Sequence, residues 1–177
     1  MKPKISVIGA GIMGTGIAQV ASSHGSLVSL MDASKDALER SRSSLNFVMN
    51  RLVEKKKISI EESDAILSRV RWTSEIESIA TSELVIEAVI ENMKVKQKIF
   101  AEVESFVSND CIIATNTSSL SVAEITSSCS NLSRVMGIHF FNPVPLMKLV
   151  EVIPMEKTAP NLVNGVKTIL QSWNKTI

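Results

Sequence analysis

The chain has 177 residues, of which 45% are hydrophobic and 21% are charged, and its 19 basic and 18 acidic side chains nearly cancel. A chain of this length can build one domain with a hydrophobic core. The balanced charge argues against nucleic-acid binding, and because apolar runs such as 84–89 are short, we expect no membrane contact. No charged-then-apolar leader opens the sequence, so we expect an intracellular, and specifically cytoplasmic, protein. Cys111 and Cys129 lie in neither a metal-binding nor a redox spacing, which predicts reduced structural thiols with no disulfide and no metal site.

Short apolar runs alternate with segments of helical periodicity along the whole chain. The predicted strands are 5–8, 27–31, 70–73, 84–89, 111–114 and 135–140. The predicted helices are 12 to about 25, 37–52, 59–67, 93–107, 121–127 and 160–173. Ser59 and Glu62 form a capping box, so a helical hairpin follows the second strand. The alternation predicts an α/β fold for residues 1–177, a doubly wound, mainly parallel sheet with helices on both faces.

The segment GAGIMG, residues 9–14, lies between the first predicted strand and the first predicted helix. At such a turn Gly9 permits a tight change of direction, Gly11 lets the main chain approach a phosphate, and Gly14 lets the helix pack on the strand. The helix N-terminus then faces the anion. We therefore expect a Rossmann-type dinucleotide site that includes Gly9, Gly11, Ile12, Met13 and Gly14. A glycine-rich turn without a ligand is the alternative.

Asp32 supports the dinucleotide interpretation. It follows the second predicted strand, 18 residues beyond Gly14, where a carboxylate can accept both ribose hydroxyls and repel a 2′-phosphate. The sequence therefore predicts NAD as the cofactor in preference to NADP. Lys35 is the one nearby residue that favours NADP instead.

Three further segments follow the glycine turn: VIEAVIENMKVKQKIFAEVE, NTSSLSVAEI and GIHFFNPVPLMKLVEVI. Together with GAGIMGTGIAQ they resemble the 3-hydroxyacyl-CoA dehydrogenase family, and the resemblance covers nearly the whole chain. It implies the NAD-binding domain of an enzyme of fatty-acid β-oxidation that oxidises (S)-3-hydroxyacyl-CoA to 3-oxoacyl-CoA by reversible hydride transfer. The family includes 3-hydroxybutyryl-CoA dehydrogenases, and lambda-crystallin also resembles it.

His139 is the candidate base. It lies at the end of a predicted strand, where it would face the cofactor crevice. The chain turns over residues 142–145 and returns, so His139 and Glu151 are equidistant from Pro145 and become potential cross-strand neighbours. We predict a dyad in which His139 accepts the 3-hydroxyl proton while Glu151 fixes the tautomer and stabilises the imidazolium. The family's catalytic pair matches these residues; a buried histidine with a purely structural carboxylate partner is the alternative.

The resemblance also assigns roles to polar residues in two loops. Ser118 is expected to contact the hydroxyl or carbonyl oxygen of the substrate as a third catalytic residue, and Asn116 to lie near the nicotinamide. Asn142, in the Pro-rich loop, is expected to bind the acyl-CoA substrate. Serine at such a position is most often a helix cap, so Ser119 or Ser121 is expected to cap the next helix.

Charged residues complete the expected site. By resemblance, Glu91 and Lys96 lie around the ribose and nicotinamide end of the cofactor, whereas their generic interpretation is a pair on a helix surface. By resemblance, Lys55 contacts the CoA moiety, and residues 55–57 form a small electrostatic clamp for its phosphates. The alternative for Lys55 is a solvated cation at a helix C-terminus, which the macrodipole favours.

The resemblance further indicates what the chain lacks. Family members continue with an all-helical domain that closes over the acyl-CoA and through which full-length members form homodimers. The present sequence ends at Ile177, so we expect an isolated cofactor-binding domain with weak activity or none. A non-catalytic NAD-binding module and an NAD-dependent hydroxyacid dehydrogenase with another substrate are the alternatives.

Overall fold

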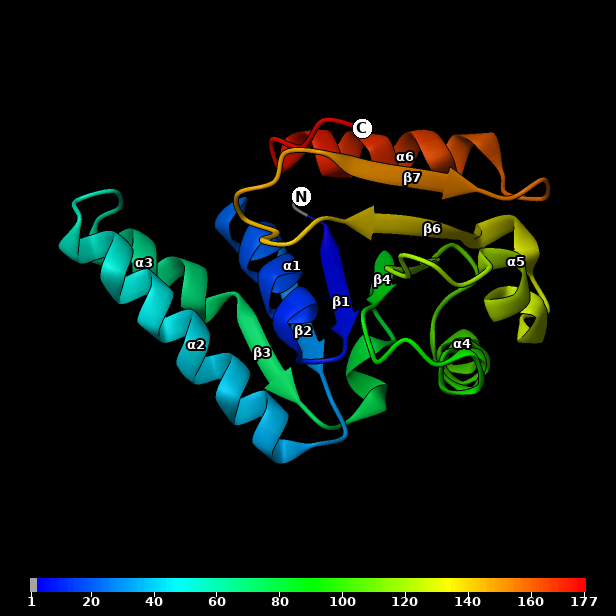
Figure 1. The fold of residues 1–177 in the computed structure, drawn as a ribbon, viewed down its shortest axis with the longest axis horizontal. Coiled ribbons are helices and arrows are strands. Elements are labelled where there is room, and N and C mark those ends of the chain that lie inside the picture. Colours follow the sequence, from blue (N-terminus) through cyan, green and yellow to red (C-terminus); the bar gives the residue numbers. More distant parts are fainter. Residues whose placement is uncertain (1–2) are drawn as a thin grey trace.

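The computed structural model describes residues 3–177, which form a seven-stranded sheet flanked by helices (Figure 1). The strands are β1 (Lys4–Ile8), β2 (Leu27–Met31), β3 (Val70–Thr73), β4 (Leu84–Glu87), β5 (Ile112–Thr115), β6 (Val135–Phe140) and β7 (Val150–Pro154). The α-helices are α1 (Ile12–Ser23), α2 (Lys35–Glu54), α3 (Ile60–Ser68), α4 (Met93–Phe106), α5 (Val122–Ile125) and α6 (Pro160–Ser172). Short 3-10 helices are η1 (Ile76–Ile79), η2 (Thr126–Ser128) and η3 (Leu132–Arg134). No helix within residues 3–177 is both long enough and apolar enough to cross a membrane.

The strand order is β3-β2-β1-β4-β5-β6-β7, in which β1 to β6 are parallel and β7 runs antiparallel to β6. The predicted doubly wound sheet is therefore confirmed, as is the helical hairpin α2–α3, which lies along the β3 side of the sheet in Figure 1. The order reverses between β1 and β4. In sheets of this kind, ligands bind in the crevice outside the carboxyl ends of the strands at that reversal.

Side chains of successive strand residues pack into two hydrophobic layers. In β4, Leu84 and Ile86 join the layer that α1, α2, α3 and α6 cover, whereas Val85 joins the layer that α4 covers. Burial on both faces explains why the parallel strands appear as continuous apolar runs in the sequence. At the end of α6, Trp173 is buried and donates its indole N–H to the Ser26 hydroxyl at 3.3 Å. This contact fastens the last helix to the turn before β2.

Several elements end at residues other than those predicted. β4 ends at Glu87 rather than at Val89, because the Val89 N–H donates to the Glu87 carboxylate at 2.7 Å instead of extending the ladder. β5 begins and ends one residue later than predicted, at Ile112–Thr115. The predicted helix 121–127 is a single turn, α5, followed by η2. The helices α1, α4 and α6 end one or two residues before their predicted ends.

Serine side chains begin both helices of the hairpin. The Ser34 hydroxyl accepts the Ala37 N–H at 3.2 Å at the start of α2. The Ser59 hydroxyl accepts the Glu62 N–H at 3.1 Å at the start of α3, as the sequence predicted. These bonds satisfy amides that have no partner within the helix.

Both cysteines lie in the interior as free thiols. Burial raises the pKa of Cys111 to about 12 and the pKa of Cys129 to about 11. Their neutral thiols therefore act as small apolar side chains in the packed layer around α4.

Candidate active site

The turn between β1 and α1 has a backbone that only glycine supports. Gly9 has φ +106°, which residues with a side chain rarely adopt. A Cβ on Gly14 would lie 1.8 Å from the Gly9 carbonyl oxygen, whereas a Cβ on Gly11 would meet no protein atom within 4 Å. The predicted turn and packing roles of Gly9 and Gly14 are confirmed. The phosphate-binding role of Gly11 stays a prediction, and the space beside it is open to a ligand.

The N-terminus of α1 provides hydrogen-bond donors next to this open space. Gly11 is the N-cap and contributes no side-chain acceptor to the first turn. The N–H groups of Ile12 and Met13 therefore lie at the positive end of a helix of 12 residues. An arrangement of this kind binds phosphate.

Asp32 follows β2 beside the glycine turn. Its Oδ2 accepts the Ala10 N–H and its Oδ1 accepts the Ser34 N–H, each at 2.8 Å. The oriented carboxylate lines a cavity of about 760 Å³ together with Gly9, η1 and α4. Carboxylate oxygens accept more than one hydrogen bond, so Asp32 can still accept ligand hydroxyls. Lys35 is exposed and does not line this cavity.

His139 and Glu151 face each other across the antiparallel strands β6 and β7. His139 Nδ1 lies 2.8 Å from Glu151 Oε2. Because a carboxylate only accepts, Nδ1 carries the proton in this bond, and in the neutral imidazole Nε2 has the lone pair. The imidazole is 17% exposed and packs on the Phe141 ring, with 4.5 Å between the centroids. The predicted cross-strand pairing is confirmed, and its catalytic role stays a prediction.

A cavity of about 300 Å³ lies where the carboxyl ends of β4, β5 and β6 meet the start of α1. Seven residues that the sequence analysis assigned to cofactor, substrate or catalysis line it: Met13, Glu91, Lys96, Asn116, Ser118, His139 and Asn142. Glu151 stands behind His139 and is not part of the lining. The fold therefore brings together residues that are up to 129 positions apart in the sequence.

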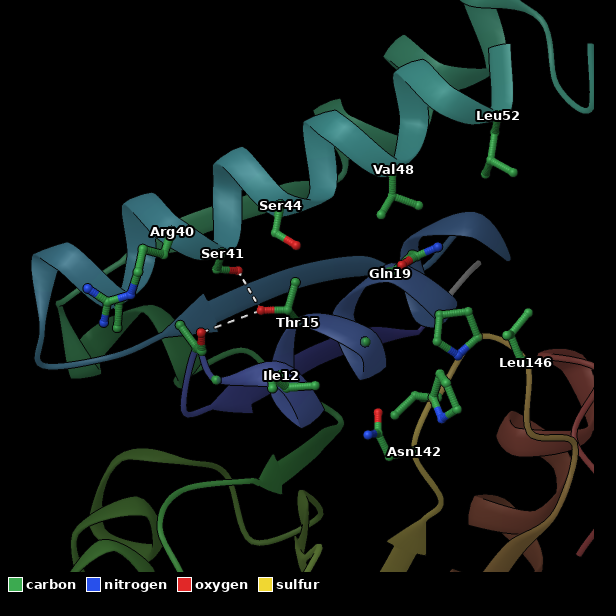
Figure 2. A pocket seen from close by; sticks show the side chains of 17 residues that line it. Ile12, Thr15, Gln19, Arg40, Ser41, Ser44, Val48, Leu52, Asn142 and Leu146 are labelled. Carbon is green, nitrogen blue, oxygen red and sulfur yellow. Dashed lines mark hydrogen bonds between the residues drawn. The ribbon is translucent and has the colours of Figure 1, made fainter. Parts of the chain in front are cut away.

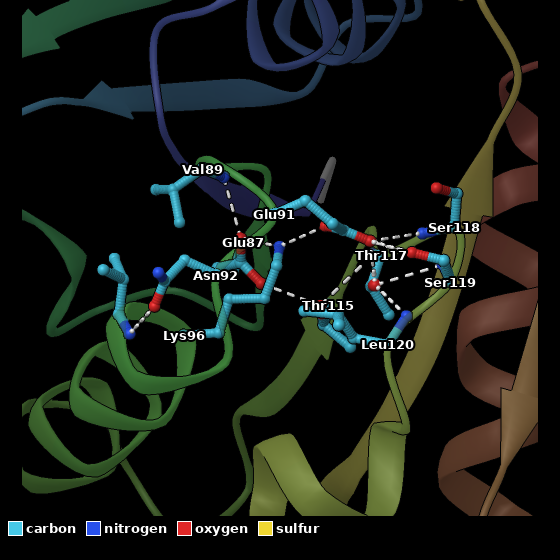
Figure 3. Close-up of polar contacts among 11 residues, drawn as sticks. Glu87, Val89, Glu91, Asn92, Lys96, Thr115, Thr117, Ser118, Ser119 and Leu120 are labelled. Carbon is cyan, nitrogen blue, oxygen red and sulfur yellow. Dashed lines mark hydrogen bonds and ion pairs between the residues drawn. The ribbon is translucent and has the colours of Figure 1, made fainter.

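An ion-pair network lies beside this cavity (Figure 3). Lys96 Nζ contacts Glu87 Oε1 at 2.7 Å and Glu91 Oε2 at 3.2 Å, and the side chains of Lys96 and Glu87 are each 1% exposed. Glu87 also accepts the Thr115 hydroxyl and the Val89 N–H, both at 2.7 Å. The interpretation of Glu91 and Lys96 as a surface pair is wrong, because the lysine is buried between two carboxylates. Glu87 was not predicted as a site residue, although an acidic residue within an apolar strand indicates a buried partner.

The Glu91 carboxylate holds the loop that follows β5. Its Oε1 accepts the Thr117 hydroxyl and the N–H groups of Ser118 and Ser119, the latter two at 3.1 and 3.3 Å (Figure 3). Burial raises the pKa of Glu91, but the hydrogen bond from Thr117, the charge of Lys96 and the Ser118 amide outweigh burial and lower the pKa to about 2. Glu91 is therefore an anion at neutral pH.

The loop leaves the Ser118 hydroxyl free. That hydroxyl makes none of the hydrogen bonds found among residues 3–177, and in Figure 3 it points away from Glu91. The Ser119 hydroxyl contacts Glu91 Oε1 at 3.3 Å, and the Ser121 hydroxyl caps α5 by accepting the Glu124 N–H at 3.3 Å. Capping therefore belongs to Ser121, and Ser118 remains available to a ligand.

Asn116 joins the ends of two neighbouring strands. Its Oδ1 accepts the Phe140 N–H at 2.8 Å, directly after His139. This bond uses the carbonyl oxygen and leaves the amide nitrogen as a donor for a ligand in the cavity.

A largely apolar groove of about 790 Å³ runs between α1, α2 and the Pro-rich loop 142–146 (Figure 2). Its lining includes Ile12, Val48, Leu52 and Leu146. Asn142 lines both this groove and the 300 Å³ cavity, so the two spaces are neighbours. Lys55 is the exposed C-cap of α2 and lies outside the groove lining. Its predicted contact with CoA stays a prediction.

The C-terminal segment and α1 hold the Pro-rich loop in place. Lys175 Nζ donates to the carbonyl oxygens of Val144 and Met147 at 2.6 and 2.7 Å. Lys175 is 8% exposed, and burial lowers its pKa. A Cβ on Gly16 of α1 would lie 2.9 Å from Val144 Cβ, so α1 also packs closely on this loop. Neither Lys175 nor Gly16 was singled out from the sequence.

Comparison with known proteins identifies the family. The sequence-family model described as the NAD-binding domain of 3-hydroxyacyl-CoA dehydrogenase matches residues 4–177. The chain belongs to this family. The family resemblance, the Rossmann-type fold and NAD as the cofactor are therefore confirmed.

Relatives of this 3-hydroxyacyl-CoA dehydrogenase domain are longer than the chain. The 3-hydroxyadipyl-CoA dehydrogenase of Escherichia coli (strain K12) is 40% identical over 171 residues, which are 97% of this chain and 36% of the relative. The 3-hydroxybutyryl-CoA dehydrogenase of Clostridioides difficile is 40% identical over 172 residues, 97% of this chain and 61% of the relative. The crystal structure of 3-hydroxybutyryl-CoA dehydrogenase from Escherichia coli K12 superposes with a TM-score of 0.96 at 39% identity, over 99% of this chain and 37% of that one. The chain thus spans about a third to three fifths of these relatives.

Proposed function

We propose that the chain is the NAD-binding part of an enzyme that oxidises (S)-3-hydroxyacyl-CoA to 3-oxoacyl-CoA, and that it carries the catalytic base. The observation that carries this proposal is the 2.8 Å bond between His139 Nδ1 and Glu151 Oε2 beside a cavity that Ser118 and Asn116 also line. It supplies a base with a defined tautomer at the carboxyl edge of a dinucleotide-binding sheet.

His139 acts on the proton of the substrate hydroxyl. Its Nε2 lone pair accepts that proton while the C3 hydrogen leaves with its electron pair. The Glu151 carboxylate then faces an imidazolium across the 2.8 Å bond and stabilises the new positive charge. The nicotinamide supplies the acceptor for the hydride, so the pair of electrons and the proton are both accounted for. In the reverse direction, the same Nε2–H protonates the oxygen.

The remaining residues orient the reactants. The free Ser118 hydroxyl would donate to the reacting oxygen, and the Asn116 amide nitrogen would donate to the cofactor in the same cavity. Asn142 stands between the cavity and the apolar groove, where it can position the acyl-CoA. The groove accommodates an extended, mainly apolar chain, and Lys55 at the end of α2 binds a phosphate of CoA.

We further propose that residues 1–177 act with an additional helical domain. A cavity with an open side admits water and holds the substrate loosely, which weakens proton and hydride transfer. The relatives that share this domain are longer, and in them the remaining length is available to close the site and to form a dimer. By itself, the chain is expected to bind NAD and to turn over acyl-CoA slowly.

The test is binding followed by turnover. NADH binding to the chain is measured by calorimetry, and acetoacetyl-CoA reduction is then followed with and without a family helical domain fused after Ile177. His139→Gln is expected to keep NADH affinity and to lose at least about a thousandfold in turnover. The matched control is His24→Gln, because His24 is the other histidine and does not line the cavity. Its Nδ1 lies 2.8 Å from the Val20 carbonyl oxygen. Near wild-type turnover by His139→Gln would reject the mechanism.

The same experiment separates the alternatives. NADH binding without turnover in the fused protein would point to a non-catalytic NAD-binding module. Turnover of a small hydroxyacid in preference to acetoacetyl-CoA would point to another NAD-dependent dehydrogenase.

A further inference from the structure

Glu87 has no part in the proposed reaction. It does not line the 300 Å³ cavity, although its chain neighbours Ala88 and Val89 do. Its three partners are Lys96, Thr115 and Val89, so it reaches the cavity only through other residues. A buried ion pair is often less stabilising than an apolar pair of the same size, so stability alone does not account for the buried Glu87–Lys96 pair.

We propose that Glu87 is a positioning residue that acts through Lys96 and raises the affinity of the site for oxidised over reduced cofactor. The proposal rests on the proposed function, because it takes the nicotinamide to bind in the cavity that Glu91, Lys96 and His139 line.

Glu87, Lys96 and Glu91 together carry one net negative charge, because a single ammonium contacts both carboxylates. Without the charge of Glu87, the ammonium would cancel Glu91 and leave no net charge beside the cavity. The oxidised nicotinamide ring is a cation and the reduced ring is neutral. A net negative wall therefore favours the oxidised form alone.

The positions of the three side chains make this charge available to a ligand. Lys96 Nζ lies closer to Glu87, at 2.7 Å, than to Glu91, at 3.2 Å. Glu87 is 1% exposed, whereas Glu91 is 38% exposed and lines the cavity. The charge of the Lys96 ammonium is thus neutralised chiefly by Glu87, which is buried away from any ligand. The charge of Glu91 therefore remains at the cavity wall.

Further contacts keep Glu87 in this position. The Thr115 hydroxyl and the Val89 N–H each donate to it at 2.7 Å, from the neighbouring strand and from its own strand end (Figure 3). With both oxygens engaged, the carboxylate cannot rotate towards a ligand, so its effect on the cofactor is electrostatic and is transmitted through Lys96.

The test compares the dissociation constants of NAD⁺ and NADH, measured by calorimetry on folded protein. Glu87→Gln keeps the size of the side chain and removes its charge. A unit charge about 10 Å from a ligand, at an effective dielectric constant of about 20, changes a binding constant by about tenfold. We therefore expect the ratio Kd(NAD⁺)/Kd(NADH) to rise by about tenfold in Glu87→Gln.

Two further variants separate charge from structure. Thr115→Val removes a hydrogen bond of the same carboxylate without changing any charge, so the ratio is expected to stay at the wild-type value. The double variant Glu87→Gln with Lys96→Met restores the single net negative charge of Glu91, and its ratio is expected to return to about the wild-type value. The double variant also keeps the test available if Glu87→Gln alone does not fold.

Each outcome has a distinct meaning. An unchanged ratio in folded Glu87→Gln, or a tenfold shift in the double variant, overturns the role of Glu87. Failure of the wild-type chain to bind either cofactor overturns the proposed function instead.

Discussion

Two glycines at the start of α1, Gly11 and Gly14, are expected to fail in opposite ways when each is replaced by alanine. In Gly14→Ala the new Cβ would lie 1.8 Å from the Gly9 carbonyl oxygen, so helix and strand must separate by more than 1 Å. Overpacking against backbone costs about 3 kcal/mol or more, since no side chain can rotate away. In Gly11→Ala the new Cβ meets no protein atom within 4 Å, so the free energy of unfolding should change by less than about 1 kcal/mol.

Cofactor affinity should fall directly in Gly11→Ala, whereas in Gly14→Ala it should fall only through unfolding. The Cβ of Gly11→Ala enters the space beside the first-turn amides of Ile12 and Met13, where the pyrophosphate is expected. Loss of two charge-assisted hydrogen bonds, at about 1.5 kcal/mol each, weakens binding by about a hundredfold. Gly14→Ala should lose affinity only to the extent that it unfolds.

Thermal unfolding followed by circular dichroism, together with NADH calorimetry on the same samples, checks both expectations. A difference of 3 kcal/mol corresponds to a fall in Tm of about 10 °C for a chain of this size. Wild-type NADH affinity in folded Gly11→Ala would refute the assignment of this turn to the pyrophosphate. Wild-type stability of Gly14→Ala would refute the packing argument.

Three further predictions concern titration and burial. The pKa of Glu91 in the folded protein is about 2, against an ordinary value of 4.5. Its carboxylate therefore stabilises the fold above about pH 4.5, and this contribution is lost as the pH falls towards 2. Urea denaturation should show a smaller stability difference between wild type and Glu91→Gln at about pH 3 than at about pH 7. Burial raises the thiol pKa values of Cys111 and Cys129 to about 12 and 11, so an aromatic disulfide reagent at about pH 8 should label the native chain only at its unfolding rate. Rapid labelling of the native protein would contradict this burial. Lys175→Met should lower the free energy of unfolding by about 1–3 kcal/mol, because the carbonyl groups of Val144 and Met147 lose their donor; an unchanged urea midpoint would show that the loop does not depend on it.

Most of the fold could be predicted from the sequence because its signals are local. The strand 135–140 and the strand 70–73 were predicted at their observed bounds, since each is an apolar run between turns. The pairing of His139 with Glu151 followed from equal spacing about Pro145, because an antiparallel return has only that register once its turn is known. The end of β4 was missed, because the Glu87 side chain decides it. The end of α5 was missed because the segment 126–128 continues as a 3-10 helix, which periodicity does not distinguish from an α-helix.

The site was less predictable than the fold, because its charged residues are buried against partners that periodicity does not reveal. Lys175 bonds a carbonyl group 31 positions away, and Lys96 is buried against a strand residue of another element. Charged residues are mostly exposed, so periodicity alone assigns both to solvent. The position of Glu87 argues otherwise, because Leu84, Val85 and Ile86 before it are apolar and the strand is buried on both faces. A carboxylate at such a position requires a cation within reach, and the helix that follows the strand offers Lys94, Lys96 and Lys98. The sequence therefore narrows the partner of Glu87 to one helix, and only the packing of α4 on the sheet selects Lys96. The Lys175 contact depends on the path of the Pro-rich loop, which no local pattern reveals.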